Sequence, residues 1–129
     1  MPAEKTKILI LEGLKSKNRN WQNSLKNKTY LNIVGITNSI NNTLYLMEIF
    51  TPDIVIIDLT YLGNKGIDAI YQIKNFNEST KIIILSDGND EKEIFASISS
   101  KTNAYCRSDI SIEALSLILV LYNLSFKLL

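Results

Sequence analysis

Three segments of the chain are short, almost wholly apolar and followed by a polar side chain. They are residues 7–11, which precede Glu12, residues 54–57, which precede Asp58, and residues 81–85, which precede Ser86. An apolar run without polar alternation is typical of a strand covered on both faces, as in a parallel sheet between helices. We therefore predict three buried strands, each with a polar residue at its carboxyl end.

Helical patterns alternate with strands along the whole chain. Two further strands are predicted at residues 31–36 and 103–107, and five helices at about 18–27, from Ser39 as N-cap to Pro52, at about 67–74, at about 90–100, and from Asp109 or Ser111 to the end. This alternation predicts one parallel sheet with right-handed crossovers and helices on both faces. The expected fold is α/β, a doubly wound five-stranded parallel sheet of the flavodoxin-like type in the order 2-1-3-4-5, with one domain at residues 1–129.

In this strand order the polar strand ends converge at one edge of the sheet. Glu12, Asp58, Ser86 and residues 105–108 are all expected there, although they are far apart in the sequence. Ligands bind at the carboxyl edge of such sheets because the loops form a crevice. Asp58 taken alone also suits a simple turn cap. Four polar strand ends together favour a functional site.

Composition removes several classes of function. The net charge is +1 over 129 residues and the lysines are scattered over both halves, so no basic stripe supports direct nucleic-acid binding. The chain has no histidine, which excludes histidine-based acid–base catalysis and most hydrolase mechanisms. Residues 63–66, Gly-Asn-Lys-Gly, have neither of the common nucleotide-binding spacings. We therefore expect neither a histidine-dependent hydrolase nor a nucleotide-binding fold.

The cysteine content and the two ends of the sequence indicate where in the cell the protein is expected. The single cysteine, Cys106, cannot form an internal disulfide and is expected to be a small core residue. No signal peptide is recognised at the start of the chain. The apolar segment at residues 114–129 is too short for a membrane span and is interrupted by polar residues. We expect a cytoplasmic protein with no membrane contact.

Four motifs give the chain a clear resemblance to a known family. They are PDIVIIDL around Asp58, the overlapping LTYLGNKGIDAI, KIIILS, and AYCRSD ahead of the last helix. With these motifs the chain resembles, over essentially its whole length, the receiver domain of bacterial two-component response regulators. The resemblance is strongest to the branch whose receivers precede a helix-turn-helix output domain.

The resemblance implies a role for each strand-end residue. Asp58 is expected to accept a phosphoryl group from a histidine kinase or another phosphodonor, Ser86 to contact that group, and Tyr105 to rotate inward as the switch aromatic. The surface of the fourth helix, fifth strand and fifth helix is then expected to change and to control transcription through an output domain or a partner. A phosphoryl group adds about 1.5 to 2 negative charges, which is enough to bias such a rearrangement.

The resemblance also implies Mg²⁺ as a cofactor, bound by Glu12, Asp58 and the backbone of Thr60. Family members carry two adjacent acids after the first strand, but here Gly13 follows Glu12, so we predict weak Mg²⁺ binding. The family's lysine near the end of the fifth strand is Ser108 here. A serine hydroxyl does not supply the positive charge that pairs with the phosphoryl oxygens.

Arg107 and Asp87 are charged residues that could compensate for the missing lysine and the missing acid. Arg107 is adjacent to Ser108, but neighbours in a strand point to opposite faces, so it is not expected to replace the lysine. Asp87, which follows Ser86, either partly replaces the missing acid or repels phosphate. The sequence leaves both roles of Asp87 open.

Three functions remain in competition. Asp58, Ser86 and Tyr105 together support a working receiver with reduced metal affinity. The loss of one acid and of the lysine supports a phosphorylation-independent pseudo-receiver that acts as a protein-interaction or dimerisation module. A flavodoxin-like flavin carrier shares the topology but needs a phosphate-binding loop after the first strand, which this chain lacks.

The last helix carries more apolar residues than one face of a sheet requires. We expect Leu117, Val120, Leu121 and Leu124 to include an outward set. This set is predicted to pack against a second copy of the chain or against an output domain.

Overall fold

Five parallel strands form one sheet in the order β2-β1-β3-β4-β5. The computed structural model describes residues 5–13, 20–62, 64–87 and 102–128. The strands are β1 (Thr6–Leu11), β2 (Leu31–Thr37), β3 (Ile54–Asp58), β4 (Lys81–Ser86) and β5 (Ala104–Arg107). The helices are α1 (Asn20–Lys26), α2 (Ile40–Phe50), the 3₁₀ turn η1 (Leu59–Tyr61), α3 (Asn64–Phe76) and α5 (Ile112–Leu128). The expected fold class and strand order are confirmed, and the helix predicted at about 90–100 lies outside the described residues.

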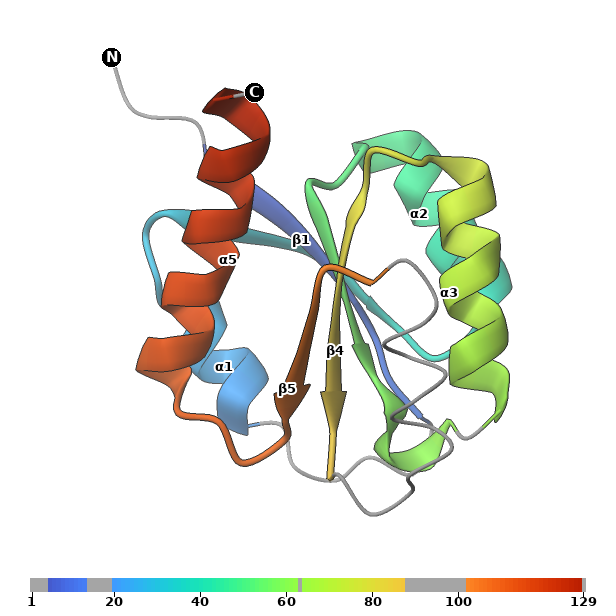
Figure 1. Ribbon diagram of the computed structural model, residues 1–129, viewed down its shortest axis with the longest axis horizontal. Helices are drawn as coiled ribbons and strands as arrows, with labels where there is room; N and C mark the ends of the chain where they lie inside the picture. The colour runs from blue at the N-terminus through green and yellow to red at the C-terminus, as the bar shows by residue number, and fades with distance from the viewer. Residues whose placement is uncertain (1–4, 14–19, 63, 88–101, 129) are drawn as a thin grey trace.

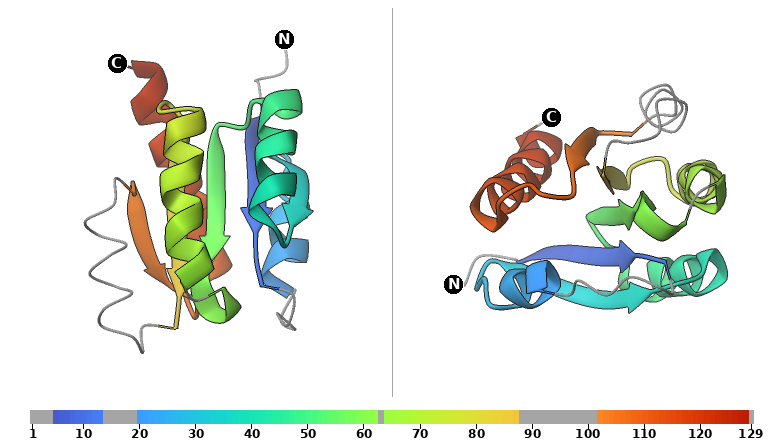
Figure 2. Two further views of the ribbon diagram at one scale, coloured as in Figure 1. Left: turned by 90° about the vertical axis from the view of Figure 1, so that its right-hand side faces the viewer. Right: turned by 90° about the horizontal axis from the view of Figure 1, so that it is seen from below.

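Helices cover both faces of the sheet. Helices α1 and α5 lie on one side, and α2 and α3 lie on the other (Figures 1 and 2). Successive residues of β3 alternate between the two sides: Ile54 and Ile56 join the apolar cluster under α1 and α5, whereas Val55 and Ile57 join the cluster under α2 and α3. A strand buried on both faces therefore needs an apolar residue at every position, as its sequence predicts.

Polar caps mark where the helices begin. The Ser39 hydroxyl accepts a hydrogen bond from the Asn42 backbone N–H at 3.2 Å, so Ser39 is the N-cap of α2. Ser111 caps α5 in the same way, through the Ala114 N–H at 3.1 Å. Helix α2 ends at Phe50, because Thr51 adopts the left-handed conformation with φ of 44° and Pro52 follows. The predicted cap and stop of α2 are confirmed, and α5 starts at the second of its two expected positions.

The register between β1 and β2 contains one irregularity. Ile8 pairs with Ile33, but the next residue, Leu9, pairs with Gly35, so Val34 is an extra residue in β2. This is the pattern of a β-bulge, which bends and twists the strand that carries it. The bulge lies on β2, a strand at the edge of the sheet.

Close packing links α3 to the turn that follows β3. A Cβ atom on Gly66, in the first turn of α3, would overlap the Leu59 side chain of η1. Leu59 is almost fully buried. Glycine at this position therefore lets α3 approach the turn directly after Asp58, and the packing holds that turn in place. No described helix is long and apolar enough to cross a membrane.

Candidate functional site

Asp58 is the last residue of the central strand and also caps the turn that follows. Its Oδ1 atom accepts a hydrogen bond from the Thr60 N–H at 3.1 Å. The residue is 7 % exposed. The capping role that sequence alone offered for Asp58 is therefore present, but it occupies one carboxylate oxygen. Within the described residues no hydrogen bond reaches the other oxygen, so the carboxylate keeps an atom for chemistry.

The strand register places the predicted polar residues at neighbouring strand ends. The β1–β3 pairing ends with Leu11 opposite Ile57, so Glu12 follows beside Asp58. On the other side Asp58 pairs with Leu85, and Ser86 is the next residue of β4. Glu12 and Ser86 are both buried, at 3 % and 1 % exposure. A separation of about 7 Å or less from Asp58 to Glu12 and to Ser86 stays a prediction, based on the clustering that a shared site requires.

Glu12 has a buried partner that the sequence did not reveal. The Gln22 Nε2 atom of α1 donates a hydrogen bond to Glu12 Oε2 at 2.6 Å. Gln22 is 2 % exposed. The sequence does indicate that Gln22 faces inward, because it lies three residues before the buried Leu25 and so falls on the same face of the helix. A glutamine among buried helix positions needs a polar partner.

Tyr105 of β5 pairs with Ile84 of β4 and packs against the apolar cluster under α2 and α3. Its hydroxyl oxygen is buried and has no hydrogen-bond partner in the described part of the chain. A buried hydroxyl without a partner costs about 1–3 kcal/mol. The tyrosine ring therefore packs on the α2 and α3 side of the sheet, and its role as the switch aromatic stays a prediction.

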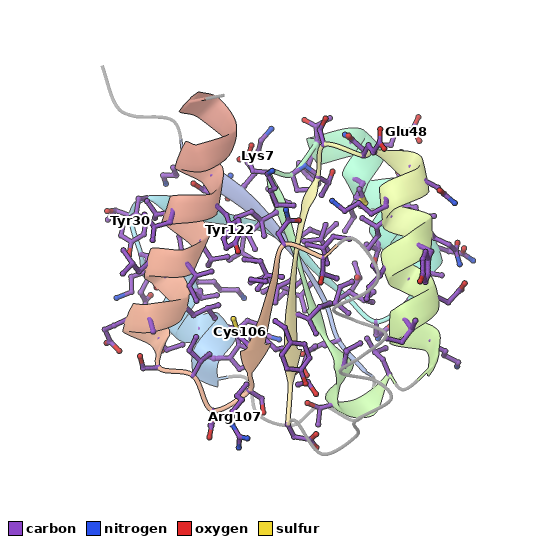
Figure 3. All side chains as sticks on the ribbon, viewed as in Figure 1. Lys7, Tyr30, Glu48, Cys106, Arg107 and Tyr122 are labelled. Atoms are coloured by element: carbon purple, nitrogen blue, oxygen red, sulfur yellow. The ribbon has the colours of Figure 1, made fainter. Side chains whose placement is uncertain are left out.

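The end of β5 does not direct a positive charge toward Asp58. Ser108, at the family's lysine position, is exposed, and its backbone N–H donates to the Ser86 carbonyl at 2.7 Å. The Arg107 Nε atom donates to Asp109 Oδ1 at 3.2 Å, with both side chains mostly exposed. Arg107 lies where β5 leaves the sheet (Figure 3). Its guanidinium is thus held by a surface ion pair of the kind that contributes little to stability.

Cys106 lies between Tyr105 and Arg107 and faces the other side of the sheet. It is 7 % exposed and belongs to the apolar cluster under α1 and α5. Burial raises the pKa of the Cys106 thiol above its ordinary value. The side chain therefore stays a neutral thiol and acts as a small core residue.

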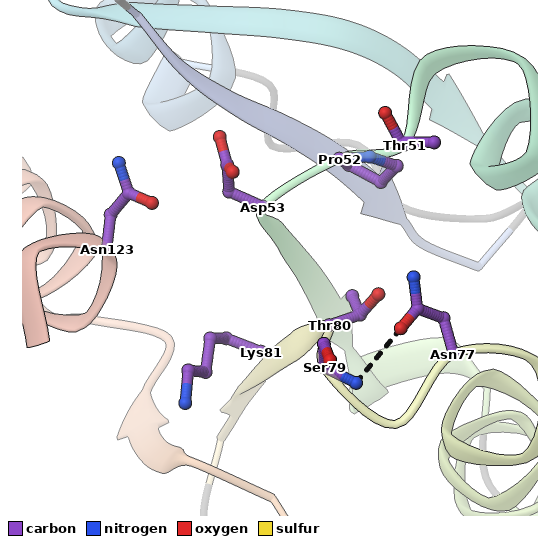
Figure 4. A pocket seen from close by; sticks show the side chains of 8 residues that line it. All are labelled: Thr51, Pro52, Asp53, Asn77, Ser79, Thr80, Lys81 and Asn123. Atoms are coloured by element: carbon purple, nitrogen blue, oxygen red, sulfur yellow. Dashed lines mark hydrogen bonds between the residues drawn. The ribbon is translucent and has the colours of Figure 1, made fainter. Parts of the chain in front are cut away.

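A polar pocket lies at the opposite edge of the sheet (Figure 4). It has a volume of about 170 Å³. Its lining residues are Thr51, Pro52, Asp53, Asn77, Ser79, Thr80, Lys81 and Asn123. Asp53 directly precedes β3 and Lys81 is the first residue of β4, whereas Asp58 is at the carboxyl end of β3. The pocket is therefore separate from the candidate site.

Comparison with solved structures supports the fold. The receiver domain of the response regulator NarL from Mycobacterium tuberculosis is similar, with a TM-score of 0.77 and 15 % identity, covering 93 % of this chain and 98 % of that one. A DNA-binding response regulator of the LuxR family from Staphylococcus aureus has a TM-score of 0.78 and 21 % identity, covering 92 % and 98 %. The receiver domain of RcsB from Salmonella enterica, with the phosphomimetic BeF₃⁻, has a TM-score of 0.75 and 19 % identity, covering 91 % and 87 %.

Sequence comparison shows the family. No curated protein matches the chain. The family model of the response regulator receiver domain matches residues 8–119, which is most of the chain. Domains of this family are signalling modules of two-component systems and are not enzymes. The chain therefore belongs to the response regulator receiver domain family.

Proposed function

We propose that this receiver domain accepts a phosphoryl group on Asp58 from a histidine kinase or another phosphodonor. The observation that carries the proposal is the buried carboxylate at the end of β3, which keeps one oxygen outside its capping hydrogen bond. That oxygen attacks the phosphorus of a phosphohistidine. The bond from phosphorus to the imidazole nitrogen breaks, and its electron pair stays on the nitrogen. The product is an acyl phosphate on Asp58.

The oxygen donors at this edge suit Mg²⁺, although they are few. Glu12, Asp58 and the Thr60 carbonyl are the hard ligands that Mg²⁺ prefers, together with water. Gly13 adds no carboxylate, and the described residues contain no group of three acidic or thiol side chains placed to hold a metal ion. When bound, Mg²⁺ offsets the negative charge that gathers on the transferred oxygens. The residues therefore fit a weak site with two carboxylates.

The switch is proposed to run from Ser86 to Tyr105. The Ser86 hydroxyl contacts the new phosphoryl group, and its movement changes the space beside the Tyr105 ring. Such a change shifts the balance between two arrangements of the surface that includes β5 and α5. That surface then controls transcription through an output domain or a partner in the cytoplasm.

One observation favours the alternative of a phosphorylation-independent pseudo-receiver. Ser108 has replaced the lysine, and the guanidinium of Arg107 is paired with Asp109 at the surface. An acyl phosphate on Asp58 would then lack the cation that usually forms an ion pair with it. In this alternative the domain acts through protein interaction or dimerisation alone.

Incubation with acetyl phosphate and Mg²⁺ distinguishes the two functions. We expect the wild-type chain to gain one phosphoryl group by intact-mass spectrometry and the Asp58→Asn variant to gain none, since an amide oxygen is a far weaker nucleophile. Circular dichroism of both proteins shows that they are folded. A folded wild-type chain that stays unmodified would establish the pseudo-receiver. Equal modification of both proteins would place the acceptor elsewhere.

Helix α5 presents apolar side chains to solvent. Leu117 and Leu121 are 59 % and 53 % exposed, whereas Val120 is half-buried. The side chain of Leu124 lies outside the described part of the structure. Beside them lies a shallow groove of about 510 Å³, which is lined by Lys28, Tyr30, Glu113, Ser116, Leu117 and Val120. We propose that this face packs against a second copy of the chain, because exposed apolar patches mark association surfaces.

Sedimentation tests this dimer. We expect the wild-type chain to be dimeric at high micromolar concentration and the Leu121→Glu variant to be monomeric, because the glutamate places a charge in the apolar contact. Ile49→Glu is the matched control, since Ile49 is an aliphatic residue with 52 % exposure on α2. A monomeric wild-type chain would leave the output domain as the remaining occupant of this face.

A further inference from the structure

The hydrogen bond between Gln22 and Glu12 joins α1 to the candidate metal site. The donor and acceptor atoms are 2.6 Å apart and both residues are at least nine-tenths buried. Burying a carboxylate is costly unless a donor satisfies it. The side-chain nitrogen of glutamine only donates, so the contact fixes which Glu12 oxygen faces α1. The contact therefore restricts the direction of the carboxylate.

We propose that Gln22 is a positioning residue that aims the Glu12 carboxylate toward a divalent cation beside Asp58. The proposal rests on the proposed function, which places a cation at this edge. With Gly13 next in the chain, Glu12 is the only acid directly after β1, so its orientation decides what β1 offers to the metal. Carboxylates that bind metals rely on hydrogen bonds from surrounding residues to hold their orientation. Gln22 supplies such a bond from a neighbouring helix.

Mg²⁺ titration without any phosphodonor tests the positioning role. Trp21 is the only tryptophan, is adjacent to Gln22 and packs against the apolar cluster under α1 and α5, so its fluorescence is a natural reporter. Gln22→Met keeps the length of the side chain and removes the donor. We expect it to weaken Mg²⁺ binding by about 10- to 100-fold, the usual effect of losing an outer partner of a metal ligand. Titration calorimetry gives the Mg²⁺ dissociation constant independently of the fluorescence.

The chain contains a matched control for this change. Gln72 Nε2 donates to Asp68 Oδ2, also at 2.6 Å, on the exposed surface of α3. Gln72→Met removes the same type of bond from a pair that is not at the site. We expect the Mg²⁺ affinity of Gln72→Met to equal that of the wild-type chain. Gln22→Asn, whose amide is one methylene shorter and therefore farther from Glu12, is a second variant that is expected to weaken binding in the same direction.

A double variant separates positioning from general destabilisation. If Gln22 acts through Glu12, adding Gln22→Met to Glu12→Gln produces no further loss of Mg²⁺ affinity. A purely structural bond would instead lower the thermal midpoint of Gln22→Met in chelator and leave its Mg²⁺ affinity unchanged, which overturns the proposal. A wild-type chain without saturable Mg²⁺ binding also overturns it. Failure of phosphorylation with Mg²⁺ binding intact counts only against the proposed phosphoacceptor function.

Discussion

Replacing Gly13 with aspartate is expected to tighten Mg²⁺ binding by at least about tenfold, which corresponds to about 1.4 kcal/mol. The new carboxylate restores the second acid after β1, next to Glu12 at the edge where Asp58 lies. Mg²⁺ gives up its waters reluctantly, so each added carboxylate strengthens a site that is short of charged ligands. Titration calorimetry of wild-type and Gly13→Asp proteins measures the difference.

The neutral variant Gly13→Asn is the control, since it has nearly the same size and lacks the charge. Gly13→Asp also adds a like charge near Glu12 and Asp58, so its thermal midpoint is expected to be low in chelator and to rise with Mg²⁺. If the wild-type chain binds Mg²⁺ as tightly as Gly13→Asp, either Asp87 already fills the missing role or Gly13 is not at the metal position.

Truncation of Ile56 to alanine is expected to lower the free energy of unfolding by about 2–5 kcal/mol. Ile56 is fully buried in the central strand and belongs to the apolar cluster under α1 and α5. Removing its outer carbons loses the transfer free energy and leaves a cavity that strands on both sides prevent from closing. Urea denaturation followed by circular dichroism gives the change.

Ile49→Ala is the matched control for this loss. Ile49 is 52 % exposed on α2, and alanine favours the helix, so its effect is expected to stay within about 0.5 kcal/mol. Similar losses in the two variants would contradict the assignment of Ile56 to the core.

The fold was predictable because local sequence patterns indicate its strands and its helix caps. Unbroken apolar runs identified the central strands, and Ser39 and Pro52 bounded α2 correctly. The strand ends were less exact: β1 begins at Thr6 and β2 extends to Thr37, each one residue beyond the apolar pattern. Backbone pairing sets those ends, and it does not depend on whether the side chain is apolar.

The site was predictable only in part. The positions of Glu12, Asp58 and Ser86 at strand ends follow from topology alone. The Gln22 contact does not, because the spacing to Leu25 places Gln22 on the inward face of α1 but does not say which residue of the sheet it meets there. The pairing of Arg107 with a surface aspartate likewise depends on the turn after β5. Long-range side-chain contacts therefore required the structure.

The bulge at Val34 has a consequence for the aggregation of the domain at high concentration. Strand β2 borders the sheet and carries no charged residue from Leu31 to Thr37. An uncharged border strand offers its backbone groups as a template for strand pairing between molecules, the first step of aggregation. The extra residue twists the border away from the flat, regular geometry that such pairing needs. The irregular register thus protects this sheet from pairing with other molecules at its edge. In other proteins a lysine on the edge strand has this role.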